Sequence, residues 1–113
     1  MQNNDNYRDF NCKVKNQCNG IEYTIAWEEE HPSSFRIMFE SQLTVVILDD
    51  EHDPEIDKVS KYMENLGFHK VMDHTVKMPG KPASYSLRFK KINEEETTNR
   101  EMMNIARALA VFK

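Results

Sequence analysis

Residues 21–27 read IEYTIAW. Large apolar side chains fill every second position of this stretch, and Glu22 and Thr24 stand between them. Successive side chains of a β-strand point to opposite faces, so the pattern predicts a strand whose apolar face is directed toward a core. The pair Asn19-Gly20 directly before the stretch favours a hairpin turn, because both residue types accept a positive φ. The fold is therefore predicted to begin with a hairpin.

Similar alternation on both sides of this stretch predicts further strands. It occurs before the turn in residues 10–15 and after the next loop in residues 35–40. The run LTVVIL, residues 43–48, is apolar on both faces, which is typical of a central strand. Residues 68–73 and 84–92 complete the predicted sheet.

Two amphipathic helices are predicted. In residues 54–66, apolar side chains recur at helical spacing between an N-cap at Asp53 and a C-terminal Gly67. The second helix begins after Thr98, which forms a capping box with Glu101 and precedes one apolar stripe that continues to the end of the chain.

The element order ββββαββα predicts an α+β domain of two layers, with a mainly antiparallel sheet and both helices packed on one face. A chain of 113 residues favours a single domain, here residues 10–113, and the polar residues 1–9 are expected to form a flexible N-terminal arm. The periodicity predicts that the following residues are buried: Ile25, Trp27, Phe39, Val45, Ile47, Val59, Met63, Leu66, Leu87, Phe89, Ile105 and Leu109.

The sequence lacks motifs for nucleophilic, metal or phosphate chemistry. No serine lies in a G-x-S-x-G elbow, the 4 histidines have no metal-ligand spacing, and 3 glycines cannot form a phosphate-binding loop. Cys12 and Cys18 form no C-x-x-C motif and are expected to be free thiols. The acidic residues of 49–57 lack the Gly and Glu of a calcium loop, and fit helix capping and a solvated turn. We therefore expect no enzymatic activity, no cofactor and no metal.

Charge is segregated along the chain. Residues 28–66 carry eleven acidic and three basic side chains, a net charge of -8, and residues 70–91 carry six basic side chains against Asp73, a net charge of +5. Opposed charges of this kind can steer a charged partner. Met38 and Met103 fall off the apolar faces of their elements and could add an adaptable contact.

We expect a small non-catalytic protein-binding module of adaptor, chaperone-like or inhibitor type. Its β-then-α order resembles, at the level of the fold, small secretion-chaperone-like domains that hold a partner chain. The candidate partner-binding residues are Lys70, Lys77, Lys81, Arg88, Lys90, Lys91, Met38 and Met103.

The alternative is a nucleic-acid-binding accessory factor that uses the basic strand pair in residues 70–91. Tyr85 and Phe89 could stack on bases there, but their alternation places them on the predicted core face. The overall net charge of -4 also disfavours unspecific phosphate binding.

Self-association and location follow from simpler features. Residues 35–40 carry few protective charges, so we expect a homodimer that forms through this strand at an edge of the sheet. No apolar run is long enough to span a membrane, and the first twenty residues are too polar for a signal peptide. The expected location is cytoplasmic, without membrane contact.

Overall fold

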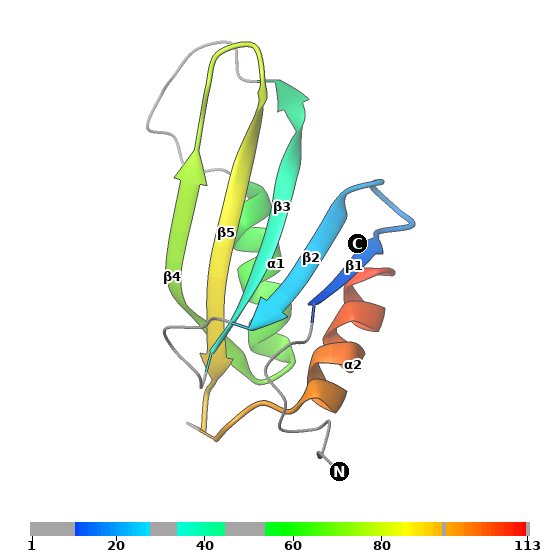
Figure 1. The fold of residues 1–113 in the computed structure, drawn as a ribbon, viewed down its shortest axis with the longest axis vertical. Helices are drawn as coiled ribbons and strands as arrows, with labels where there is room; N and C mark the ends of the chain where they lie inside the picture. Colours follow the sequence, from blue (N-terminus) through cyan, green and yellow to red (C-terminus); the bar gives the residue numbers. More distant parts are fainter. Residues whose placement is uncertain (1–10, 28–33, 45–53, 94, 113) are drawn as a thin grey trace.

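In the described part of the chain, five strands and two helices form the fold (Figure 1). The computed structural model describes residues 11–27, 34–44, 54–93 and 95–112. In chain order the elements are β1 (Asn11–Lys15), β2 (Glu22–Trp27), β3 (Phe35–Thr44), α1 (Pro54–Asn65), β4 (Phe68–Val76), β5 (Pro82–Lys91) and α2 (Asn99–Leu109). The order βββαββα confirms the predicted α+β class, with one strand fewer than the sequence pattern indicated.

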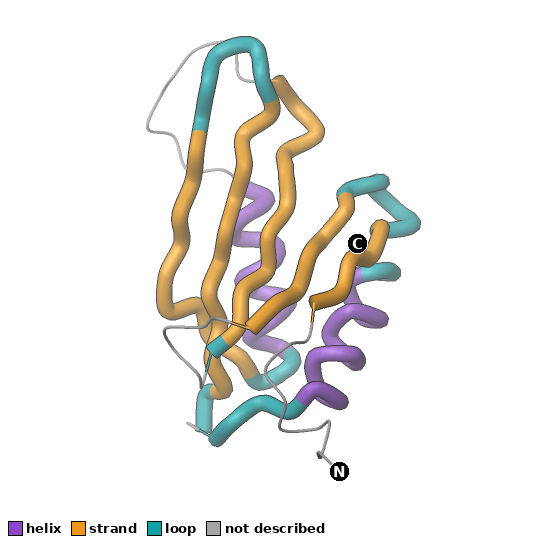
Figure 2. Tube along the Cα trace, in the orientation of Figure 1, coloured by secondary structure: helices purple, strands orange, loops and turns teal. Residues whose placement is uncertain are grey.

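The five strands form one antiparallel sheet in the order β1-β2-β3-β5-β4. Both helices lie on the same side of this sheet (Figure 2). α1 contacts β4, and α2 contacts β1 and β2. The predicted arrangement of two layers, with the helices on one face, is therefore confirmed.

The separate strand predicted in residues 43–48 is wrong. β3 continues without interruption through Ser41-Gln42 to Thr44. The ladder between β3 and β5 has a register shift between Glu40 and Thr44, and such an irregularity changes the side-chain alternation without ending the strand. Residues 45–48 lie outside the described residues.

The ends of α1 are close to those expected. The helix begins at Pro54, as predicted, and the proposed N-cap Asp53 lies outside the described residues, as does the predicted arm, residues 1–9. The helix ends at Asn65 rather than one residue later. Gly67 then adopts a φ of 96°, a left-handed conformation that favours glycine after a helix.

One hydrophobic core joins the sheet to both helices. Leu66 was predicted to be buried but is 42% exposed, because the helix has ended and the chain turns toward β4 at this position. Val45 and Ile47 lie outside the described residues. The other predicted core residues are buried as expected: Ile25, Trp27, Phe39, Val59, Met63, Leu87, Phe89, Ile105 and Leu109.

A buried asparagine fastens the β1–β2 turn to the end of α2. Asn16 is 1% exposed, and its Nδ2 donates to the backbone oxygens of Leu109 at 2.7 Å and Phe112 at 2.8 Å. Its Oδ1 accepts from the backbone N–H groups of Cys18 at 2.7 Å and Asn19 at 2.9 Å. One side chain therefore satisfies carbonyls at a helix C-terminus and shapes a hairpin.

The other end of α2 is held by a cap and an ion pair. The predicted capping box is present, since Thr98 Oγ1 accepts from the Glu101 N–H at 3.2 Å and Glu101 Oε1 accepts from the Thr98 N–H at 3.2 Å. The second carboxylate oxygen of Glu101 lies 2.7 Å from Lys91 Nζ at the end of β5. Glu101 thus links the start of the helix to the sheet.

Candidate functional site

The side of the sheet opposite the helices is here called the open face. Directly opposed residues of antiparallel strands share a face, so the ladder registers define its rows. One row, which runs from β2 to β4, consists of Thr24, Met38, Ser86 and His74. The next row consists of Ala26, Arg36, Arg88 and Met72. Both described helices pack on the other face, so within the described residues no helix covers these rows.

Two arginines stand side by side on the open face. Arg36 of β3 is directly opposite Arg88 of β5, and both side chains are half-buried. Lys90 lies two residues further along β5, opposite His69 of β4. Like charges at opposed positions repel each other, so an anion between them would lower this repulsion. Guanidinium groups are suited to bidentate hydrogen bonds with carboxylates or phosphates. Arg36, Arg88 and Lys90 are called the cationic end of the open face.

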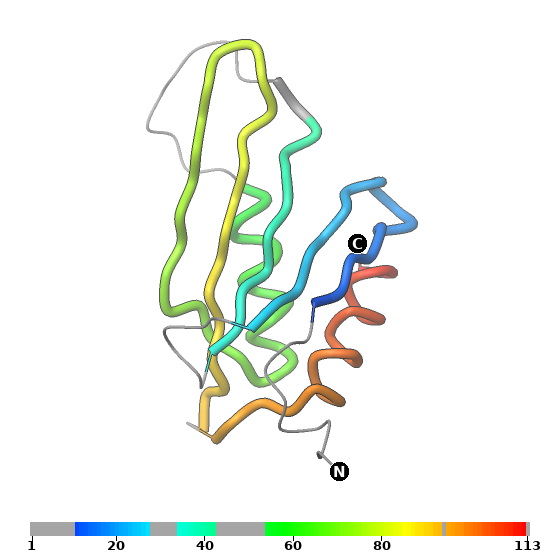
Figure 3. Tube along the Cα trace, in the orientation of Figure 1, coloured from blue at the N-terminus to red at the C-terminus, as the bar shows by residue number. Residues whose placement is uncertain are grey.

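The sheet is split at the other end of the open face. The ladder between β2 and β3 extends only from Trp27 opposite Phe35 to Thr24 opposite Met38. β3 continues beside β5 as far as Thr44, while β2 diverges from it with β1 (Figure 3).

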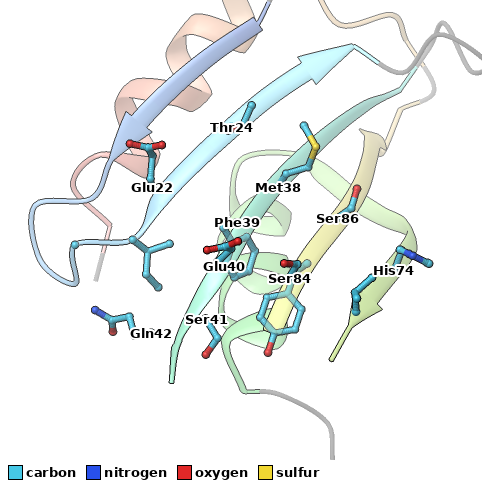
Figure 4. Close-up of a pocket in the computed structure, with 14 residues that line it drawn as sticks. Glu22, Thr24, Met38, Phe39, Glu40, Ser41, Gln42, His74, Ser84 and Ser86 are labelled. Carbon is cyan, nitrogen blue, oxygen red and sulfur yellow. The ribbon is translucent and has the colours of Figure 1, made fainter. Parts of the chain in front are cut away.

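A pocket of about 740 Å³ lies where the strands part (Figure 4). It extends from the β1–β2 turn across β3 and β5 to β4. Its lining residues are Gly20, Ile21, Glu22, Thr24, Met38, Phe39, Glu40, Ser41, Gln42, His74, Val76, Ser84, Tyr85 and Ser86. The pocket therefore lies partly on the open face and partly in the gap where β2 and β3 separate.

Aromatic rings close the pocket toward the core. The ring of Phe39 packs against Tyr23 of β2 and against Tyr85 of β5, each at a centroid distance of 5.1 Å. Burial raises the pKa of Tyr23, a hydrogen bond with Asn19 lowers it, and the charge of Glu55 raises it; the net pKa is above its usual value. Tyr23 is therefore a neutral phenol at pH 7. Phe39 and Tyr85 belong to the pocket lining and are here called its floor, whereas Tyr23 lies behind them in the core.

The walls and the mouth of the pocket are polar. Glu22 of β2 and Glu40 of β3 stand on opposite sides of the split, and both are exposed. Among the described residues, neither carboxylate takes part in an ion pair. At the mouth, Gln42 Nε2 donates to the backbone oxygen of Asn19, which joins β3 to the β1–β2 turn.

The pocket offers charge and hydrogen bonds rather than an assembled catalytic pair. Ser84 and Ser86 form no hydrogen bond with His74, the histidine of the lining. Within the described part of the chain, no group of three or more His, Cys, Asp or Glu side chains could hold a metal ion. Cys12 and Cys18 are free thiols, the first half-buried and the second exposed.

The structure divides the predicted partner-binding residues among several surfaces. Arg88 and Lys90 belong to the cationic end, and Met38 lines the pocket. Lys70 forms an ion pair with Asp73 at 2.6 Å, and Lys91 is held by Glu101 beside α2. These last two lysines do not join the open face, because their positions alternate with those that do.

The remaining candidates are farther away. Lys77 and Lys81 lie in the connection between β4 and β5, and Met103 is 39% exposed on α2, on the other side of the sheet. Tyr85 is 2% exposed and Phe89 is 0% exposed, so neither can stack on a base. The expected basic platform with aromatic rings is therefore not formed.

Sequence reasoning missed Arg36 and misplaced an edge. Arg36 alternates with the apolar Phe35 and Ile37, which was the available signal, but it lies in a segment of strongly acidic composition. Residues 35–40, expected at an edge, belong to the central strand β3, and the edge strands are β1 and β4. Alternation identifies a residue's face but not the position of its strand in the sheet.

In comparisons with known proteins, the chain has no significant match to a protein family, a curated protein or a solved structure. Neither described helix is long and apolar enough to cross a membrane.

Proposed function

We propose that the protein is a non-catalytic protein-binding module, of adaptor, chaperone-like or inhibitor type, that holds its partner on the open face. The observation that carries this proposal is a sheet face without a helix over it, in the described residues, that combines a pocket with a cationic end. A half-buried Met38 connects the two. Flexible methionine and long arginine side chains can adapt to a partner surface.

The chemistry of the cationic end favours an acidic stretch of the partner. The guanidinium groups of Arg36 and Arg88 can donate paired hydrogen bonds to a carboxylate, and the ammonium group of Lys90 can donate to another carboxylate oxygen. Charge complementarity of this kind raises the rate of association and selects between partners. We therefore place the first contact with the partner at the cationic end.

A nucleic-acid partner has less support from the geometry. Its phosphates would meet Arg36, Arg88 and Lys90. The aromatic side chains of the sheet, however, are on the face that packs against the helices, here called the covered face. Binding of single strands usually combines a basic groove with exposed aromatic rings. The nucleic-acid alternative therefore enters as an outcome of the test.

Site-specific photo-crosslinking tests the proposal. A benzoylphenylalanine is introduced in place of Ser86 on the open face and, as a control, in place of the exposed Lys58 on α1. We expect a discrete protein adduct from the Ser86 position only. Charge reversal by Arg36→Glu with Arg88→Glu should remove that adduct, with circular dichroism used to verify the fold.

Equal labelling from both positions would contradict a binding role for the open face. An adduct that is destroyed by nuclease would favour the nucleic-acid alternative instead. That alternative also requires that oligonucleotide binding, measured by fluorescence anisotropy, is tight at low salt, falls steeply between ~50 and ~200 mM salt and is lost in Arg88→Glu with Lys90→Glu.

Two accompanying proposals concern assembly and location. We propose that the protein self-associates through β4, because this strand lies at an edge of the sheet and its Val71, Met72 and Val76 are exposed. A monomer mass in sedimentation at high micromolar concentration would contradict it. The two free thiols support a cytoplasmic location, which fractionation of the source cell would check.

A further inference from the structure

The split in the sheet leaves part of β3 without a strand on its β2 side. Among the described residues, β2 forms no ladder with β3 beyond Met38, whereas β3 continues for six residues to Thr44. Six residues of a strand span roughly 17 Å at about 3.4 Å per residue. A strand edge of this length is sufficient for pairing with a short extended segment.

The pocket beside this edge has two different sides. Its floor is formed by Phe39 and Tyr85, which are apolar and almost fully buried, and its walls carry the carboxylates of Glu22 and Glu40. An extended peptide directs alternate side chains to opposite faces, so it can present an apolar side chain to the floor and a polar one to the open face. The pocket therefore matches the alternation of a β-strand.

The charge of the pocket indicates which polar side chain a bound peptide would carry. Among its lining residues Glu22 and Glu40 are the acidic ones, and no Lys or Arg lines it. Lys15 lies opposite Glu22 on β1 but forms no ion pair with it. Both carboxylates are exposed and can therefore accept a lysine or arginine side chain from a partner.

We infer that the pocket between β2 and β3 binds an extended peptide segment with alternating apolar and basic residues, which adds to β3 as a strand. This inference rests on the proposed function and names the partner chemistry at the pocket. The peptide's backbone groups supply the binding free energy through ladder hydrogen bonds, and Glu22 and Glu40 supply the selection for Lys or Arg. Gln42, which bridges the mouth to Asn19, must release that contact as the segment enters.

The probe is a fluorescein-labelled octapeptide in which Lys and Val alternate, and binding is measured by fluorescence anisotropy with the full chain. A peptide with Glu in place of Lys tests whether binding depends on the charge of the peptide. Two further versions, N-methylated on the Lys amides or on the Val amides, test strand pairing, because a methylated amide cannot donate a hydrogen bond. Amide chemical shifts of the ¹⁵N-labelled protein locate the bound peptide.

We expect the Lys-Val peptide to shift the amide signals of Phe39 and Glu40. Glu22→Gln with Glu40→Gln should weaken binding about three- to tenfold, since exposed ion pairs contribute modestly. Glu64→Gln, on an exposed residue of α1, is the matched control and should bind like the wild type. N-methylation of at least one alternate set should weaken binding about tenfold or more.

Gln42→Ala removes the bridge at the mouth and should bind the Lys-Val peptide as well as, or better than, the wild type. The inference is overturned if the Glu-Val peptide binds equally, if neither methylated set loses affinity, or if no peptide binds. In each case a protein adduct at the Ser86 position would still support the proposed function. Peptide binding together with no such adduct would instead support the inference and contradict the broader proposal.

Discussion

The two faces of the sheet are made from alternate residues of the same strands, but their surroundings differ. On the covered face, Ile25, Ile37 and Leu87 form a row in which every side chain is buried beneath the helices. On the open face, the neighbouring row holds Arg36 and Arg88 at half-buried positions. The fold uses one face for its core and leaves the other for polar and charged side chains.

The two faces therefore contribute differently to stability and to recognition. The covered face removes aromatic and aliphatic surface from water, which is the main favourable contribution to folding. The open face lies outside the core cluster, apart from the pocket floor, so its residues can change with a smaller effect on folding. Substitutions on adjacent residues of one strand can therefore separate the two roles.

The sharpest comparison uses neighbours on β5. Leu87→Ala should destabilise the protein by about 2–5 kcal/mol, through lost transfer free energy and a cavity in the core. Ser86→Ala, on the open face, should change the free energy of unfolding by less than about 0.5 kcal/mol. Urea unfolding followed by circular dichroism measures both. Equal effects would show that the two faces are not distinct.

Asn16→Ala tests a buried polar group between the sheet and α2. The substitution leaves the carbonyls of Leu109 and Phe112 without this donor, so we expect a loss of about 1–3 kcal/mol. Asn104→Ala, on an exposed residue of α2, is the matched control. A similar unfolding midpoint for the two variants would rule out Asn16 as the fastening between the hairpin and the helix.

The N-terminus of α2 allows a smaller test. Thr98→Ala removes the N-cap acceptor and should cost about 1 kcal/mol. Glu101→Gln retains an N3 side chain compatible with the capping box but removes the charge that faces Lys91, so we expect a loss of about 0–1 kcal/mol that decreases with added salt. A larger loss for Glu101→Gln than for Thr98→Ala would reverse this ranking.

The smallest predicted effect appears only at alkaline pH. Burial raises the pKa of Tyr23, so the unfolded chain ionises this phenol before the folded protein does. The neutral phenol's contribution to the free energy of unfolding is fully present below about pH 10, the pKa of this group in the unfolded chain. Stability decreases as the pH rises through that value toward the pKa of Tyr23 in the folded protein. Tyr23→Phe should lack this part of the decrease, which urea midpoints between pH 8 and about 11 would reveal.

Tyr62→Phe is the control for the alkaline test, because it retains Tyr23. It should show the same decrease of the urea midpoint as the wild type. If Tyr23→Phe also retains the full decrease, another group is responsible, and the burial of this phenol does not contribute measurably to the pH dependence of stability.

The periodic patterns correctly predicted most of the local structure. Alternation in residues 21–27 placed one set of side chains in the core, and the capping box at Thr98 and Glu101 marked the start of the last helix. These signals succeed because the period of two in a strand and the caps of a helix depend on residues close together in the sequence. They failed at Ser41-Gln42, where the pattern indicates a break between two strands, because the ladder is irregular between Glu40 and Thr44 while β3 continues.

The sequence pattern was sufficient to predict the α+β class, the first residue of each helix and most of the residues that face the core. The folded sheet was needed to show that β3 is central, that Arg36 stands beside Arg88, that Lys91 pairs with Glu101 and that β2 and β3 part beyond Met38. The physical reason is that alternation assigns a side chain to a face, whereas its cross-strand neighbour depends on strand order and register between distant segments. The candidate site consists of such neighbours, so the folded sheet was needed to assemble it.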